Sequence, residues 1–173
     1  PGDPVVAAMR GRMDVVTGGL DSFEALSEVT AGCEVVFHLA GKVHTTPKSP
    51  EEEREFFTVN EQGTRSLLEA SRRNGVRRVI LYSTVGVYGK DADFHGDERS
   101  PCDPVTAYAK SKYLAEGLVL SSAGEGGPEG VVLRFPVVYG PFDRGNMAAL
   151  IGAIRARRFF YFGDGSSRRS MIS

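Results

Sequence analysis

The sequence lacks the features that mark several classes of protein. Its 21 basic and 22 acidic residues give a net charge of -1, so no excess of one sign favours nucleic acid or an anionic membrane. Its apolar runs are far shorter than the roughly 20 residues that cross a bilayer. Cys33 and Cys102 show no metal spacing and do not make a disulfide framework, which favours a reducing cytoplasm. Because His38, His44 and His95 are scattered through unlike elements, we expect no metal site.

What is present is one domain's worth of chain. The 173 residues are 41% hydrophobic and 25% charged, which is ordinary for a soluble globular protein. The chain starts at Pro1, not Met, and stops at Ser173 inside what reads as the start of another element. We therefore expect a fragment that is open at both ends.

The most informative stretch is residues 108–112, which read YAKSK. Tyr108 and Lys112 are four residues apart, so they share one face of a helix. An ammonium beside a phenol favours the phenolate, and the sequence therefore predicts a lowered pKa for Tyr108 and a role in proton transfer. The helix is expected over residues 105–123, with Thr106 as its N-cap. Its predicted apolar stripe consists of Leu114, Leu118 and Val119.

Strand and helix patterns alternate along the chain. Strands are predicted at residues 14–17, 34–41, 78–83, 131–135 and 159–162. Helices are predicted at residues 7–12, 22–31, 51–74, 105–123 and 145–157. This alternation predicts βαβ units in an α/β fold with a doubly wound, Rossmann-like parallel sheet. Ligands bind beyond the carboxyl ends of such strands, where residues 40–41, 83–84 and 137–138 lie.

Two further motifs flank the tyrosine in a fixed order. Residues 79–89 read VILYSTVGVYG and residues 131–141 read VVLRFPVVYGP. Together with YAKSK, this set resembles the extended short-chain dehydrogenase/reductase family, and within it the nucleotide-sugar epimerases and reductases. The resemblance implies that Tyr108 is the catalytic acid or base, that Lys112 lowers its pKa, and that Thr84 orients the substrate oxygen. Ser83 is the alternative to Thr84, and a turn that closes the strand is the structural alternative for Thr84.

The resemblance also implies an NAD cofactor. It assigns cofactor contacts to Tyr108 and Lys112 and to four further residues: Leu20, Ala40, Gly41 and Val138. Small residues such as Ala40 and Gly41 leave room for a dinucleotide close to the backbone. The family's glycine-rich phosphate loop is absent from these residues, and the positions that separate NAD from NADP would precede Pro1, so NADP stays open.

The resemblance implies a nucleotide-sugar substrate, with Arg169 as the diphosphate ligand, since a guanidinium binds phosphate bidentately. A solvated loop pair of Arg168 and Arg169 is the alternative. The implied reaction is C4 epimerisation or 4-keto reduction, by tyrosine-assisted hydride transfer at a sugar carbinol. A hydroxysteroid-type or other small-alcohol dehydrogenase and a non-catalytic dinucleotide sensor are the alternatives. Sugar-nucleotide dehydratases have an acid where this chain has Val85 and Gly86, which disfavours dehydration.

The expected organisation is a dinucleotide-binding domain at residues 1–141 followed by the start of a substrate-binding lobe at residues 142–173. Within the family the helices at 51–74 and 105–123 often pair across a two-fold axis, which implies a homodimer. The residues Phe56, Leu68 and Leu118 are assigned either to that interface or to the core.

Three residues near the expected site have structural interpretations. His38 lies in an apolar strand and is expected to be a hydrogen-bonded core residue. Asn60 matches the family's asparagine on the helix behind the site, where it supports structure or a proton-relay water. Gly63 lies within a predicted helix, where glycine is unfavourable by about 1 kcal/mol relative to alanine, which indicates close packing on the sheet.

Overall fold

The computed structural model describes residues 11–43, 46–89, 95–140, 146–160, 164 and 170–173. The helices among them are α2 (Phe23–Thr30), α3 (Pro50–Phe56), α4 (Gly63–Arg73), α5 (Ala107–Ser121) and α6 (Asn146–Arg155). A π-helix η1 (Phe57–Gln62) joins α3 to α4, and 3₁₀ turns η2 (Val85–Tyr88) and η3 (Ser122–Glu125) follow β2 and α5. The strands are β1 (Val35–His38), β2 (Arg78–Thr84), β3 (Glu129–Phe135), β4 (Val137–Val138) and β5 (Met171–Ile172).

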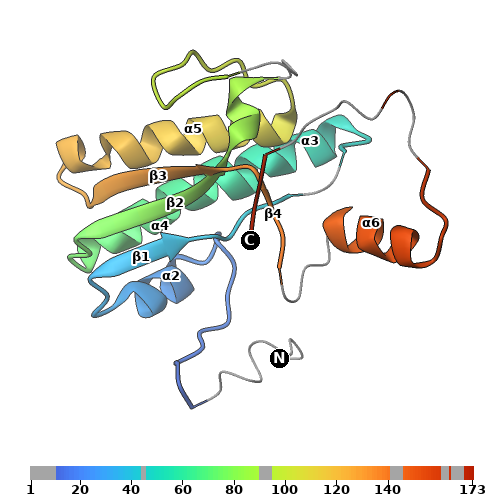
Figure 1. Cartoon of the computed structure of the whole chain (residues 1–173). Helices are drawn as coiled ribbons and strands as arrows, with labels where there is room; N and C mark the ends of the chain where they lie inside the picture. Colours follow the sequence, from blue (N-terminus) through green and yellow to red (C-terminus); the bar gives the residue numbers. More distant parts are fainter. Residues whose placement is uncertain (1–10, 44–45, 90–94, 141–145, 161–163, 165–169) are drawn as a thin grey trace.

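The main sheet has the order β1-β2-β3, and both pairs of neighbouring strands are parallel. Val35 lies opposite Arg78, and Ser83 lies opposite Arg134, so the carboxyl ends of the strands meet at one edge. Helices α2, α4 and α5 cover one face of this sheet (Figure 1). This arrangement confirms the predicted α/β class with a parallel sheet. A second, two-stranded parallel sheet joins β4 to β5, and the sequence did not predict it.

Two apolar clusters fill the space between the helices and the sheet. One joins α2 to α4 through Leu26, Leu67 and Ala70, with Leu20, Phe23 and Val36 packed against it. The other joins α5 to the sheet through Leu81, Ala115 and Val119, with Leu68 and Val132 packed against it. These contacts hold α5, which carries Tyr108 and Lys112, firmly on β2 and β3.

The helices begin where the sequence predicted. Ser22, Ser49 and Thr106 each accept a hydrogen bond from the backbone N–H three residues on, which pairs one of the free donors of a helix start. Pro50 at the first turn of α3 is followed by three glutamates, an arrangement that suits the positive end of the helix dipole.

Several predicted elements differ from the structure. The predicted helix 51–74 contains the π-helical turn of η1, which periodicity alone does not reveal. Residues 14–17 form no strand, and neither do residues 159–160; residues 161–162 lie outside the described residues. The predicted helix at 7–12 falls mostly outside them too, and residues 11–12 form a turn.

Burial also differs from the sequence patterns. Residues 34–41 form a nearly continuous apolar run, a pattern typical of a strand covered on both faces, yet Phe37 in β1 is 58% exposed. The apolar stripe predicted for α5 is wrong at Leu114, which is 45% exposed. The helix instead buries mainly small and polar side chains, among them Ser111, Lys112 and Glu116. A prediction from an apolar stripe fails here because the buried face of α5 includes charged side chains.

Candidate active site

The candidate site lies where β2 ends beside the first turn of α5. A Cβ added to Gly86 would lie 3.3 Å from Thr84 Oγ1 and 3.9 Å from Ala109 Cβ. Gly86 therefore separates the end of β2 from the helix residue that follows Tyr108. The turn after Thr84 therefore packs against the helix that contains Tyr108.

Thr84 is better placed than Ser83 for contact with a ligand. The Thr84 hydroxyl accepts a hydrogen bond from the backbone N–H of Gly86 at 3.1 Å, which is the turn that the structural alternative predicted. One acceptor position is used in this way, and the hydroxyl proton is left for another partner. The Ser83 side chain is 6% exposed, and its hydroxyl donates to a carboxylate oxygen of Glu116 at 2.5 Å.

Tyr108 is half-buried in the first turn of α5. Its ring meets the ring of Phe56 edge-on, with centroids 6.4 Å apart. Burial raises the pKa of the Tyr108 phenol above its usual value, because a buried phenolate loses hydration. The lowered pKa that the sequence predicted is therefore wrong for this arrangement of the protein.

Lys112 lies one turn further along α5 and is 4% exposed. Burial lowers the pKa of its ammonium to about 8, and the nearby Glu116 carboxylate opposes that shift. At neutral pH the side chain is still mainly protonated. A positive charge therefore lies on the same helix face as Tyr108, in the part of the chain that is largely shielded from water.

Asn60 connects the loop after β1 to α5. Its Oδ1 accepts from Lys42 N at 2.7 Å, and its Nδ2 donates to Lys42 O at 3.1 Å and to Ser111 Oγ at 2.9 Å. Ser111 Oγ in turn donates to the backbone oxygen of Tyr108 at 2.9 Å. Asn60 belongs to η1, and π-helical turns frequently occur at functional sites.

His38 is the buried core residue that the sequence predicted. It is 3% exposed, and its Nε2 lies 2.9 Å from Thr64 Oγ1. Burial, reinforced by the charge of Lys112, lowers the pKa of the imidazole to about 4. The ring is therefore neutral at physiological pH.

The predicted cofactor residues fall into two groups. Ala40 and Val138 are exposed, at the carboxyl edge that also carries Thr84. Gly41 and Leu20 make close internal contacts. A Cβ on Gly41 would lie 2.9 Å from Asn60 Oδ1, and the Leu20 side chain packs against Gly63 and the core. Gly63 is therefore closely packed, and its nearest neighbour is the Leu20 side chain.

Other expectations concern a substrate ligand, a metal site and a membrane span. Arg168 and Arg169 lie outside the described residues. Within the described part of the chain, no cluster of three or more candidate metal ligands occurs. No helix among those residues has the length and apolarity to cross a membrane.

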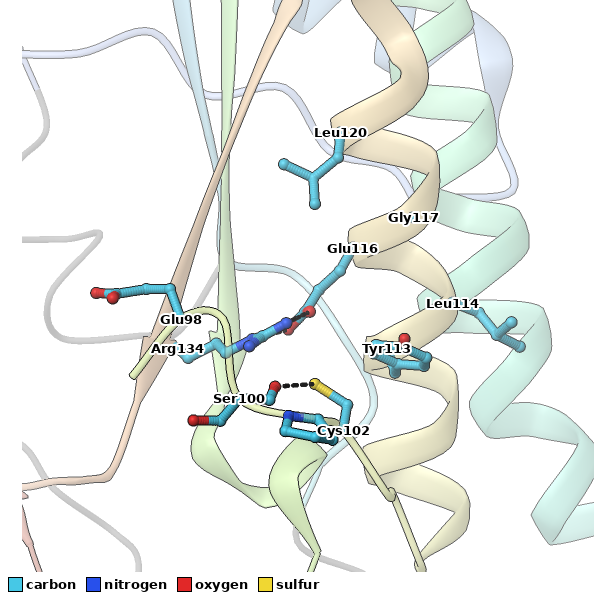
Figure 2. Close-up of a pocket in the computed structure, with 10 residues that line it drawn as sticks. Glu98, Ser100, Cys102, Tyr113, Leu114, Glu116, Gly117, Leu120 and Arg134 are labelled. Carbon is cyan, nitrogen blue, oxygen red and sulfur yellow. Dashed lines mark hydrogen bonds and ion pairs between the residues drawn. The ribbon is translucent and has the colours of Figure 1, made fainter. Parts of the chain in front are cut away.

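The sequence interpretation missed a buried charged cluster between α5 and the sheet. Glu116 on α5 is 1% exposed, and its carboxylate pairs with the guanidinium of Arg134 on β3 at 2.7 Å. Figure 2 shows these two side chains pointing toward each other at a pocket of about 460 Å³. Two signals were available: Glu116 is four residues after Lys112, and Arg134 lies in the quoted motif at 131–141. Neither position by itself predicts that the two side chains form an ion pair.

The fold and site together define a Rossmann-like α/β domain with a tyrosine–lysine pair at the carboxyl edge of its sheet. The chain belongs to the NAD dependent epimerase/dehydratase family, whose family model matches residues 3–173. This confirms the resemblance that the motifs predicted.

Curated relatives extend the comparison. The N-acetyl-alpha-D-glucosaminyl-diphospho-ditrans,octacis-undecaprenol 4-epimerase of Escherichia coli O157:H7 is 34% identical over 156 residues, which are 89% of this chain and 46% of that protein. A 3beta-hydroxysteroid-dehydrogenase/decarboxylase (isoform 1) of Arabidopsis thaliana is 30% identical over 167 residues, covering 93% of this chain and 37% of that protein. The chain spans about half the length of the first of these, and less of the second.

A solved structure is similar along nearly the whole chain. The UDP-glucuronic acid 4-epimerase of Bacillus cereus, determined with UDP-glucuronic acid and NAD, superposes with a TM-score of 0.82 at 26% identity. The match covers 96% of this chain and 54% of that chain.

Proposed function

We propose that the complete protein is an NAD-dependent nucleotide-sugar C4 epimerase or 4-ketoreductase. The observation that carries this proposal is the packing of α5, which contains Tyr108 and Lys112, against β2 and the turn η2 that follows Thr84. The family membership supports the cofactor class. Two relatives named as 4-epimerases support the reaction, and the one determined with UDP-glucuronic acid supports a nucleotide-sugar substrate.

The residues at the sheet edge fit a dinucleotide. Ala40 and Val138 are exposed and small or medium in size, so the backbone beside them is accessible. NAD, when bound, takes up and returns the hydrogen and electron pair of the sugar carbinol. Ala40, Gly41, Val138 and Leu20 are the residues that we assign to holding it, Leu20 through its backbone because its side chain packs internally.

Each catalytic side chain has a separate role. The Thr84 hydroxyl, whose proton is free of the turn hydrogen bond, donates to the reacting sugar oxygen. Tyr108 takes the proton of the sugar hydroxyl and returns it at the end of the reaction. The Lys112 ammonium stabilises the phenolate that Tyr108 becomes, which offsets the desolvation that raises its pKa.

Dehydration is disfavoured by the turn after β2. Expulsion of a sugar hydroxyl needs an acid at the site. Val85, which is 41% exposed, and Gly86 occupy the positions where such an acid is expected. Neither side chain can give a proton.

The test is an assay of the complete gene product with UDP- and dTDP-hexoses and NAD. Replacing Tyr108 by Phe is expected to lower turnover about 10²- to 10⁴-fold while NAD still binds. Tyr113→Phe, an exposed position on the same helix, is the matched control and is expected to leave turnover unchanged. Wild-type protein that converts none of these sugars, or full activity in Tyr108→Phe, would refute the proposal.

A hydroxysteroid-type alcohol dehydrogenase is the second candidate, because the Arabidopsis thaliana relative matches 93% of this chain. The catalytic chemistry is the same, and only the ligand beyond the carbinol differs. Replacing Arg169 by Ala is expected to weaken binding of a nucleotide diphosphate sugar and to leave a sterol unaffected. A non-catalytic dinucleotide sensor would instead bind NAD with the same affinity in wild type and Tyr108→Phe and show no turnover in either.

The predicted homodimer is retained as part of the proposal. Phe56 is 0% exposed and therefore contributes to the core, whereas Leu68 is half-buried and packs against the cluster of Leu81, Ala115 and Val119. Exposed apolar side chains on α5 support an interface there: Tyr113, Leu114 and Leu120. Sedimentation of the complete protein is expected to give a dimer, and Leu120→Glu is expected to shift it toward monomer.

A further inference from the structure

Glu116 is the most deeply buried carboxylate among the described residues. It is 1% exposed, and burying an ionised carboxylate is costly unless it is paired and hydrogen-bonded. Both of its oxygens accept from Arg134, with Nε at 3.2 and 3.1 Å and Nη2 at 2.7 Å. Ser83 donates a further hydrogen bond from its hydroxyl at 2.5 Å. The carboxylate is therefore held by the two strands on which α5 packs.

The partners of Glu116 are themselves fixed. Ser83 and Arg134 lie opposite each other in the β2–β3 ladder, and Ser83 directly precedes Thr84. Arg134 also donates from Nη1 to the Tyr88 hydroxyl at 2.8 Å, and its guanidinium lies 4.8 Å from the centre of that ring. Tyr88 closes the turn after Thr84. One buried carboxylate thus ties α5 to the strand end and turn on which Thr84 depends.

Glu116 also shares a helix face with the catalytic pair. Lys112 precedes it by four residues and Tyr108 by eight, so the three side chains follow each other at one-turn steps. Both Lys112 and Glu116 are buried, where electrostatic interactions are less screened by water.

We propose that Glu116 is a positioning residue for Tyr108 and Lys112. It fixes α5 against the ends of β2 and β3, and it holds a negative charge one turn from the Lys112 ammonium. The inference rests on the proposed function, since it assigns Glu116 a role in that same site. We assign Glu116 no contact with substrate or cofactor.

Other charged or titratable groups surround the pair. They are His38 on β1, Tyr88 in η2, Arg134 on β3, Cys102 in the loop before α5, and the Lys42–Glu55 ion pair beside Phe56. Among the described residues, Glu116 is the group whose charge raises the pKa of Lys112. His38 is neutral at physiological pH, so it adds no positive charge.

The experiment compares three variants of the complete protein. Glu116→Gln removes the charge at nearly constant size. The double variant Glu116→Leu with Arg134→Met replaces the buried pair by apolar side chains, an exchange that frequently preserves or improves stability. Glu129→Gln is the matched control, because Glu129 pairs with Arg78 across the same two strands at their exposed amino ends.

The first readout needs no substrate. The pKa of Lys112 is measured by NMR titration of protein labelled at the lysine Cε, with the signal assigned by Lys112→Met. Glu116→Gln is expected to lower the pKa of Lys112 from about 8 by about one unit or more. At a given pH this is a tenfold decrease in the ratio of ammonium to amine. The double variant is expected to regain stability and keep the lowered pKa, and Glu129→Gln to keep the wild-type value.

The second readout is turnover. Glu116→Gln is expected to reduce kcat at neutral pH about 10- to 100-fold, with KM within about threefold, and to shift the pH–rate profile. An unchanged Lys112 pKa in Glu116→Gln would overturn the inference, and so would a double variant in which stability and pKa recover together. If none of the sugars or sterols is converted, the function proposed above fails, while the NMR titration still decides the role of Glu116.

Discussion

The side-chain amide of Asn60 donates a hydrogen bond to Ser111 Oγ at 2.9 Å, although the two residues are 51 positions apart in the chain. Through it, the loop after β1 is joined to the helix that carries Tyr108, because the same amide also pairs with both backbone groups of Lys42. The Asn60 side chain therefore connects the loop after β1 to helix α5.

Replacing Asn60 by Ala is expected to lower the free energy of unfolding by about 2–3 kcal/mol, since it leaves the backbone groups of Lys42 without their partner. Denaturant unfolding measures this change. Ser66→Ala, which removes an exposed hydroxyl contact on the following helix, is the control and should change stability by less than about 0.5 kcal/mol. Equal effects of the two substitutions would contradict the bridging role of Asn60.

Replacing Lys112 by Met is expected to stabilise the protein at pH 7 by about 1–3 kcal/mol while abolishing turnover. The folded pKa of Lys112, about 8, lies below its ordinary value of 10.5, so its contribution to stability is fully present above pH 10.5 and is lost as the pH falls through 8. The gain from Lys112→Met should therefore shrink as the pH is raised toward 10. Lys110→Met, at an exposed position on the same helix, should show neither effect.

Acid should destabilise the protein through His38. Its folded pKa of about 4 lies below the ordinary 6.5, so the unfolded state binds the proton first and stability falls as the pH drops from 6.5 through 4. The loss is on the order of 3 kcal/mol. Thr64 gives its one hydroxyl proton to Asn60 O, so the His38 Nε2 must be the donor to Thr64. His38→Gln can supply that donor without titrating, and its unfolding curve should lack this part of the pH dependence.

Two glycines offer a matched pair of tests. A Cβ on Gly63 would lie 2.7 Å from Leu20 Cβ, whereas a Cβ on Gly117 would meet nothing within 4 Å. Gly63→Ala should therefore destabilise the protein by about 1–3 kcal/mol through overpacking. Gly117→Ala should stabilise helix α5 by about 0.5–1 kcal/mol. Thermal unfolding of both variants checks the pair, and stabilisation by Gly63→Ala would show that Leu20 moves aside.

The sequence predicted local features well where the interactions that determine them lie within a few residues of each other. Thr106 is recognisable as an N-cap because the hydrogen bond that it makes reaches only three residues ahead, to the backbone of Ala109. The sequence did not predict the π-helical turn at residues 57–62, nor that the Asn60 side chain in this turn bonds to the loop at Lys42 and to Ser111, which are distant in the chain.

The amino-acid sequence by itself determined the alternation of strands and helices, the tyrosine–lysine spacing on one helix face and the family, since each depends on neighbours along the chain. Only the tertiary structure decided which buried groups meet. The buried cluster joins three elements, through Glu116 on α5, Arg134 on β3 and Ser83 on β2. Its contacts follow from the register of β2 with β3 and from the packing of α5 against both strands. The pKa of Lys112 and that of Tyr108 were decided there too, because burial is a property of the packed domain and of no single segment.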